Sequence, residues 1–161
     1  GGIAMSISKI SRVPEVKGAL EEYKRDALNA IGISIAGGAK ERSPVQDGVL
    51  RASISWAIDG DPPQYPQGEQ VQKNDTHPEG SQAVNRGVQA PPNSVIIGSN
   101  VDYAREQHEN MNYKHTKTIQ KGPNKGQQVQ VGEAKFIENA ANEFRPRILP
   151  TVKRALKGEL R

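Results

Sequence analysis

A long stripe of apolar residues near the start of the chain constrains the fold more than any other feature. Its members recur at steps of three and four residues: Val16, Leu20, Tyr23, Ala27, Ile31, Ile35 and Ala39. Such spacing places them on one face of an α-helix. Pro14 suits the first turn, where its missing N–H is not needed. Because Pro44 disfavours helical backbone at Ser43, the helix should end by about Arg42. A helix is marginally stable alone, so this stripe must pack against something flat.

A second pattern follows the turn signal at residues 44–48. Its apolar members alternate with smaller or polar residues: Leu50, Ala52, Ile54, Trp56 and Ile58. A period of two predicts a half-buried strand. Leu50 and Ile54 are also four residues apart, so the first turn could be a short helix instead. We interpret Trp56, the only tryptophan, as a core residue rather than a ligand-stacking one, because it lies within this alternating pattern.

The segment from residue 59 to 94 is predicted to be a long exposed loop. Residues 59–93 are polar and rich in proline. A connection of this length without secondary structure is a functional loop, an arm or a disordered segment. Its few apolar side chains cannot offset the entropy of ordering, so we expect it to order against a partner. Asp59, Asp61 and Glu69 could bind a divalent cation, but scattered loop carboxylates are more often solvated.

Two short elements are expected downstream of this loop. The apolar run Val95–Ile97, closed by Gly98, predicts a second strand. Residues 101–109 could form a helical turn. Residues 113–121 and 127–131 flank a Gly-Pro-Asn-Lys-Gly sequence, which predicts a hairpin with a flexible tip.

The last predicted element is helical, with apolar residues every four positions: Phe136, Ala140, Phe144, Ile148, Val152 and Leu156. Pro146 and Pro150 lie within this pattern. A proline in a helix interior removes a hydrogen bond and costs about 3 kcal/mol. We therefore expect a break near Arg145, with one of the two prolines starting a second helix.

The composition narrows the possible functions. The 161 residues fit one domain, which we place at residues 5–161, since residues 1–4 precede Met5 and resemble a cloning remnant. Only 34% of residues are hydrophobic and 4% aromatic, so the core should be thin and aliphatic. The chain has no cysteine, which excludes disulfides and thiolate chemistry. No apolar run is long enough for a membrane span, and no signal peptide is visible.

No catalytic or metal-binding motif stands out. The three histidines, His77, His108 and His115, are not at a zinc-binding spacing, and phosphate-loop and hydrolase signatures are missing from the sequence. We therefore predict a protein that is not an enzyme and that carries no metal or cofactor.

Basic residues gather in two places although the net charge is only +4. One group follows the C-terminal helix: Arg145, Arg147, Lys153, Arg154, Lys157 and Arg161. Cations near a helix C-terminus also offset the helix dipole, which accounts for Lys157. The other group lies on the predicted hairpin: Lys114, Lys117, Lys121 and Lys125. These four lysines are the candidate contact site for a partner or for nucleic acid.

Three stretches, taken in order, resemble a known family. Residues 39–54 read A-K-E-R-S-P-V-Q-D-G-V-L-R-A-S-I, residues 95–104 read V-I-I-G-S-N-V-D-Y-A, and residues 135–140 read K-F-I-E-N-A. Together they resemble the head–tail joining proteins (neck, tail-completion or minor tail components) of long-tailed bacteriophages. The chain departs from that family at Asp47, where threonine is usual, and in the length of the segment from 59 to 93.

The resemblance implies an α+β fold, with a long N-terminal helix and a C-terminal helix packed on a small antiparallel sheet and with long exposed loops. It also implies a structural virion protein that forms a homo-oligomeric ring at the head–tail junction or tail end. Its partners would be other neck and tail proteins, with passing contact with DNA and none with a membrane. Assembly would take place in the host cytoplasm.

Two other functions remain open. The first is a small nucleic-acid-binding module that uses the lysine-rich hairpin, and the second is a hydrolase or nuclease whose site assembles in space. For any of these functions, the apolar faces predict the same core: Ile31, Ile35, Leu50, Ile54, Trp56, Ile97, Phe136 and Phe144.

Overall fold

The computed structural model describes residues 13–44, 48–58, 64, 90–99, 101, 103–112 and 114–161. Most of the predicted loop over residues 59–94 lies outside these ranges, as do Asp59, Asp61, Glu69 and His77. Residues 1–12 also lie outside them. What the sequence predicts for these segments, and for a single domain over 5–161, stays a prediction.

The described residues form helices and short antiparallel strands, and the fold is α+β as predicted. In chain order the elements are α2 (Val13–Arg42), α3 (Val49–Ser53), β1 (Ser55–Ile58), β2 (Val95–Gly98), α4 (Ala104–Glu109), β3 (Thr116–Thr118), β4 (Gln128–Gln130) and α5 (Phe136–Leu156). Strand β1 pairs with β2, and β3 pairs with β4. Within the described ranges, no helix has the length and apolar character needed to cross a membrane.

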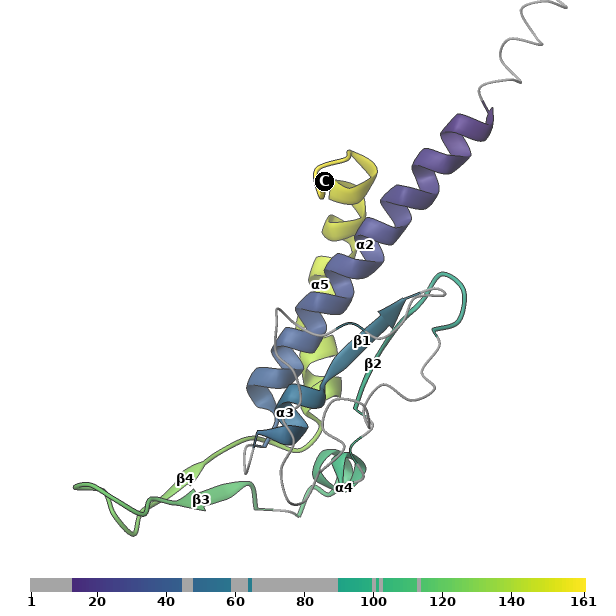
Figure 1. Ribbon diagram of the computed structural model, residues 1–161. Coiled ribbons are helices and arrows are strands. Elements are labelled where there is room, and N and C mark those ends of the chain that lie inside the picture. Colours follow the sequence, from purple (N-terminus) through teal and green to yellow (C-terminus); the bar gives the residue numbers. More distant parts are fainter. Residues whose placement is uncertain are drawn as a thin grey trace, which may run out of the picture.

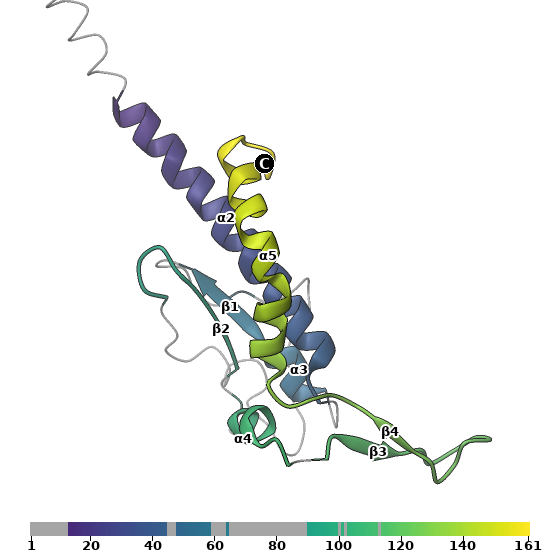
Figure 2. The same cartoon turned by 180° about the vertical axis from the view of Figure 1, so that it is seen from behind.

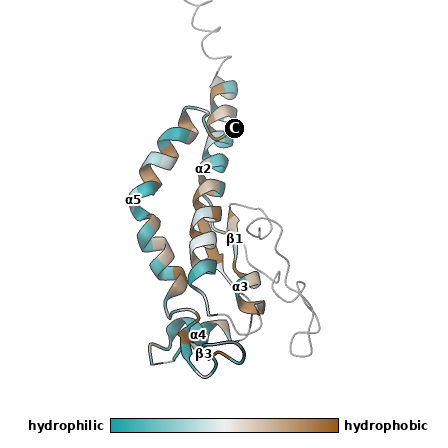
Figure 3. Ribbon diagram, turned by 90° about the vertical axis from the view of Figure 1, so that its left-hand side faces the viewer, coloured by the Kyte–Doolittle hydropathy of each residue, from teal (hydrophilic) through white to brown (hydrophobic). Residues whose placement is uncertain are grey.

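Helix α2 is the central element of the fold. It lies between α5 on one side and the β1–β2 sheet on the other (Figures 1 and 3). The two helices are antiparallel, since Gly38 of α2 lies beside Ala140 near the start of α5, whereas Asp26 pairs with Arg161 beyond its end. The buried part of the long stripe thus packs on both a helix and a sheet.

Helix α2 meets strand β1 at a glycine. A Cβ atom on Gly32 would lie 2.2 Å from Cδ1 of Trp56, so the indole occupies the space that a larger residue would fill. The Trp56 side chain is buried, which confirms its prediction as a core residue. Its Nε1 donates a long hydrogen bond of 3.5 Å to Oδ1 of Asn29.

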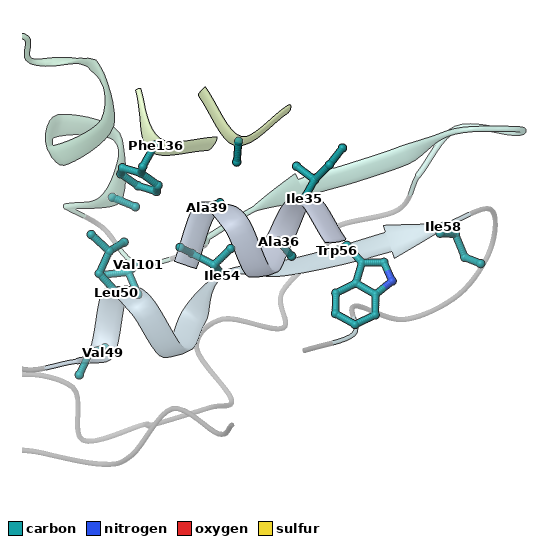
Figure 4. Packing of buried hydrophobic residues seen from close by; sticks show 12 residues of the cluster. Ile35, Ala36, Ala39, Val49, Leu50, Ile54, Trp56, Ile58, Val101 and Phe136 are labelled. Atoms are coloured by element: carbon teal, nitrogen blue, oxygen red, sulfur yellow. The ribbon is translucent and has the colours of Figure 1, made fainter. Parts of the chain in front are cut away.

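One apolar cluster joins these elements (Figure 4). Five of the predicted core residues are buried in it: Ile35, Leu50, Ile54, Trp56 and Phe136. The other three are partly buried and pack against it: Ile31, Ile97 and Phe144. The apolar faces read from the sequence are therefore confirmed as the core.

The segment after α2 differs from a half-buried strand in two ways. Residues 49–53 form α3, as the four-residue spacing of Leu50 and Ile54 allowed, and the strand begins only at Ser55. All four residues of β1 are buried. The physical reason is enclosure: β2 lies on one edge, Gln64 pairs with Trp56 on the other, and α2 covers one face.

The expected break near Arg145 is wrong, because α5 is one helix that contains both prolines. Pro146 and Pro150 are exposed and four residues apart, so they lie on the same outward side of α5. The carbonyls of Asn142 and Pro146 lose their N–H donors, and because both residues are exposed, water can replace the donor. Figure 3 shows α5 bowing away from α2 in its middle, as expected for a helix that is convex toward solvent.

Candidate interaction surfaces

A hairpin projects from the body of the molecule (Figures 1 and 2). Thr116 pairs with Gln130 at its base and Thr118 with Gln128 farther out, and every residue of β3 and β4 is exposed. Its tip turns at Gly122 and Gly126, both with positive φ. The hairpin is confirmed, and its strands bury no side chain in their own subunit.

The four lysines proposed as a contact site all lie on this hairpin or beside its base. Lys114, Lys117, Lys121 and Lys125 are exposed, and none forms an ion pair with a residue that the structure describes. The sequence from residue 111 to 132 contains no acidic residue. The hairpin therefore carries uncompensated positive charge, which suits an acidic or phosphate-bearing partner. Contact with such a partner stays a prediction.

The base of the hairpin is held by the body. His115 is buried, and its carbonyl accepts a hydrogen bond from the Val131 N–H. Burial lowers the pKa of the His115 imidazole below its ordinary value. Gly132 lies against Pro44, where a Cβ atom would come within 2.4 Å of backbone, and the Glu133 N–H donates to the Arg42 carbonyl.

The described residues of the stretch 39–54, which are 39–44 and 48–54, lie at the corner between α2 and β1. The buried hydroxyls of Ser43 and Ser53 donate to the carbonyls of Lys40 and Leu50, three residues earlier in each case. The Arg51 guanidinium donates to the Ser43 carbonyl at 3.2 Å. Gly48 has a φ of 83°, a left-handed conformation that favours glycine. These contacts fix the shape of the corner.

A pocket of about 380 Å³ opens between β2, α4 and the start of α5. Phe136 and Ile97 line it, and the His108 ring meets Phe136 edge to face at 4.9 Å between centroids. At its rim Lys135 bonds Glu109, and this contact holds the pKa of the Glu109 carboxyl below its usual range. In the described part of the chain, no cluster of three or more residues could hold a metal ion.

The structure also exposes apolar side chains on α2 and α5, of which Val16, Leu20 and Leu156 belong to the stripes predicted from the sequence. Val16 and Leu20 of α2 are 57% and 49% exposed, and Leu149 and Leu156 of α5 are 61% and 53% exposed. Sequence reasoning missed this surface, because a helical stripe shows which residues share a face and not where the packing partner ends.

Comparison with known proteins identifies a bacteriophage family that covers most of this fold. The family described as "Bacteriophage HK97-gp10, putative tail-component" matches residues 7–107, which is more than half of the 161 residues. The match spans the central helix, the corner, the β1–β2 sheet and most of α4. No match was found among curated proteins or among solved structures. The chain belongs to the HK97-gp10-like family of bacteriophage tail components.

Proposed function

We propose that this chain is a non-enzymatic subunit that forms a ring at the head–tail junction or the tail end, in contact with neck and tail proteins. Membership in a family of tail components already makes it a structural phage protein of the virion, with other phage structural proteins as its partners. The ring, its place along the virion and its assembly in the host cytoplasm are the proposed part.

The observation that carries the proposal is the projecting hairpin. An isolated two-stranded hairpin is marginally stable in water. Here all six strand residues are exposed, so the two strands gain no burial from their own subunit beyond the base. Packing against a neighbouring subunit or ring would supply the missing burial, as in other segments that order on assembly.

The test shortens the hairpin without disturbing its base. Thr116 and Gln130 face each other in the ladder, so residues 117–129 can be replaced by an Asn-Gly turn. The shortened chain should keep the wild-type melting temperature and lose its assembly by mass photometry. It should also fail to restore infectivity to a phage that lacks the gene. Wild-type assembly and normal plaque numbers from the shortened chain would contradict the proposal.

A second candidate function, binding of nucleic acid through the hairpin, is favoured by the four exposed lysines. If all four contact phosphates, the logarithm of DNA affinity should fall with the logarithm of salt concentration with a slope of about −3.6, at about −0.9 per contact. Changing Lys114, Lys117, Lys121 and Lys125 to glutamine should abolish that dependence. A DNA affinity that changes neither with salt concentration nor with these substitutions would exclude this function.

A further inference from the structure

The first turns of α2 project beyond the other described helices and strands (Figures 1 and 2). Among the described residues, Arg161 near the C-terminus reaches α2 at Glu22, Tyr23 and Asp26, through two ion pairs and a ring contact. Val16 and Leu20 continue the stripe that is buried farther along at Ala27. They therefore form an apolar end of α2, on the same side of the helix that α5 covers at later residues of α2.

The outer side of α5 carries a second apolar strip. Leu149 and Leu156 are seven residues apart, so they lie two helical turns apart on the same face. Both are more than half exposed. Arg145 and Lys153, each four residues from Leu149, share this face, so apolar and cationic side chains alternate along it.

The two surfaces have opposite charge. Residues 13–22 contain three glutamates and one lysine. Glu21 pairs with Lys24 and Glu22 with Arg161 of the same chain, whereas Glu15 is exposed and lies two turns beyond Glu22 along the projecting end. Residues 144–158 contain five basic residues and no acidic one. The start of α2 is apolar and acidic, and the outer face of α5 is apolar and basic. The two surfaces are therefore complementary in charge, and each exposes apolar side chains.

We propose that the projecting end of α2 docks across the outer face of α5 of a second copy of this chain. Val16 and Leu20 would pack against Leu149 and Leu156, with Glu15 near Arg145 or Lys153. The two surfaces are different patches of one chain, so the contact is heterologous and repeats from subunit to subunit, closing into a ring when the rotation allows. The inference rests on the proposed function, because it names the contact that would build the ring.

The test uses the absence of native cysteine. Leu20→Cys and Leu149→Cys are made as separate full-length variants, mixed in equal amounts and oxidised mildly. Docked copies hold the two thiols at high effective concentration, so this pair should cross-link about tenfold more than a control pair. The control is Leu20→Cys with Met111→Cys, because Met111 is 69% exposed and closely follows α4, which lies at the opposite end of the molecule from the start of α2 (Figure 1).

Charged variants give a second readout. Leu20→Glu and Leu149→Glu should each be monomeric by size-exclusion chromatography with light scattering, with unchanged melting temperatures because both side chains are exposed. A mixture of the two should form dimers, since it retains one intact helix end and one intact α5 face. Self-association of Leu149→Glu alone would mean that the helix ends pair with each other, and it would overturn the proposed docking.

The failure of this inference can be told from the failure of the ring proposal. If the wild-type chain assembles but the Leu20–Leu149 pair cross-links no more than the control, this contact is wrong and the ring proposal stands. If no species larger than a monomer forms in any sample, both are overturned.

Discussion

Gly32 and Trp56 set the distance between α2 and β1. With no Cβ at residue 32, the indole can lie directly over the helix backbone. Sequence periodicity cannot reveal the contact at Gly32, because it is defined by the spacing of apolar side chains and a glycine has none. The pairing becomes visible only when the helix and the strand are placed together.

At this contact we predict that Gly32→Ala destabilises the protein. The added methyl would overlap the Trp56 ring, and overpacking of this kind costs about 1–3 kcal/mol, less the gain in helix propensity. Gly18→Ala is the matched control, since nothing lies within 4 Å of its Cβ position, and it should stabilise the helix. Urea denaturation of both variants measures the difference. Equal stabilisation of the two would show that the indole is not held against Gly32.

His115 gives a prediction for pH. Burial lowers its pKa in the folded chain, whereas in the unfolded chain the imidazole takes up a proton near pH 6.5. As the pH falls below about 6.5, the unfolded state therefore binds more protons, and the folded state loses stability. The lowered pKa of the Glu109 carboxyl acts in a separate and more acidic range.

The measurement is the melting temperature between pH 7.5 and 5.5. The wild-type protein should lose stability over this range, and His115→Gln should lose less because its side chain does not titrate. If both proteins show the same pH dependence, His115 is not the group responsible.

Among the elements, α5 departs most from expectation. The penalty for an interior proline is a local cost, and it predicted a break near Arg145. The continuous helix keeps its packing on α2, and its two prolines face solvent. Tertiary packing of the inner face therefore outweighs the local preference.

Because each proline lies within a continuous helix at a local cost, replacing either one should stabilise the protein. Pro146→Ala and Pro150→Ala each restore an N–H donor and the best helix-forming residue within a helix that is already formed, for a gain of about 1–3 kcal/mol. Thermal unfolding followed by circular dichroism checks this. A lower melting temperature would instead mean that the bow of α5 depends on the prolines.

At the scale of the whole molecule, the long connection between β1 and β2 begins and ends within the fold. Gln64 exchanges two backbone hydrogen bonds with Trp56, at 3.0 and 2.6 Å, and Ala90 is buried. These anchors bracket residues 65–89, which lie outside the described ranges. A deletion between the anchors should therefore spare the core.

We predict that deleting residues 66–89, with a short Gly-Ser linker in their place, leaves the melting temperature unchanged but blocks tail joining. The sequence of this segment has few apolar side chains to offset its ordering entropy within one subunit, so its role should lie in contact with a partner. The check is complementation of a phage that lacks the gene, and heads and tails should accumulate separately. Infectious particles made with the shortened chain would show that residues 66–89 are not needed for tail joining.

The sequence alone determined which faces are apolar, where the central helix ends, that a hairpin spans residues 116–130, and the phage family, since the family match agrees with the resemblance found in three stretches. These properties follow from neighbouring residues, because side-chain periodicity and turn chemistry are local. Tertiary structure decided that β1 is fully enclosed, that α5 continues through its prolines, that Trp56 lies over Gly32, and that the stripe on α2 stays exposed at Val16 and Leu20. Each of these features depends on contacts between elements that are far apart in the sequence, and a local sequence pattern carries no information about such contacts.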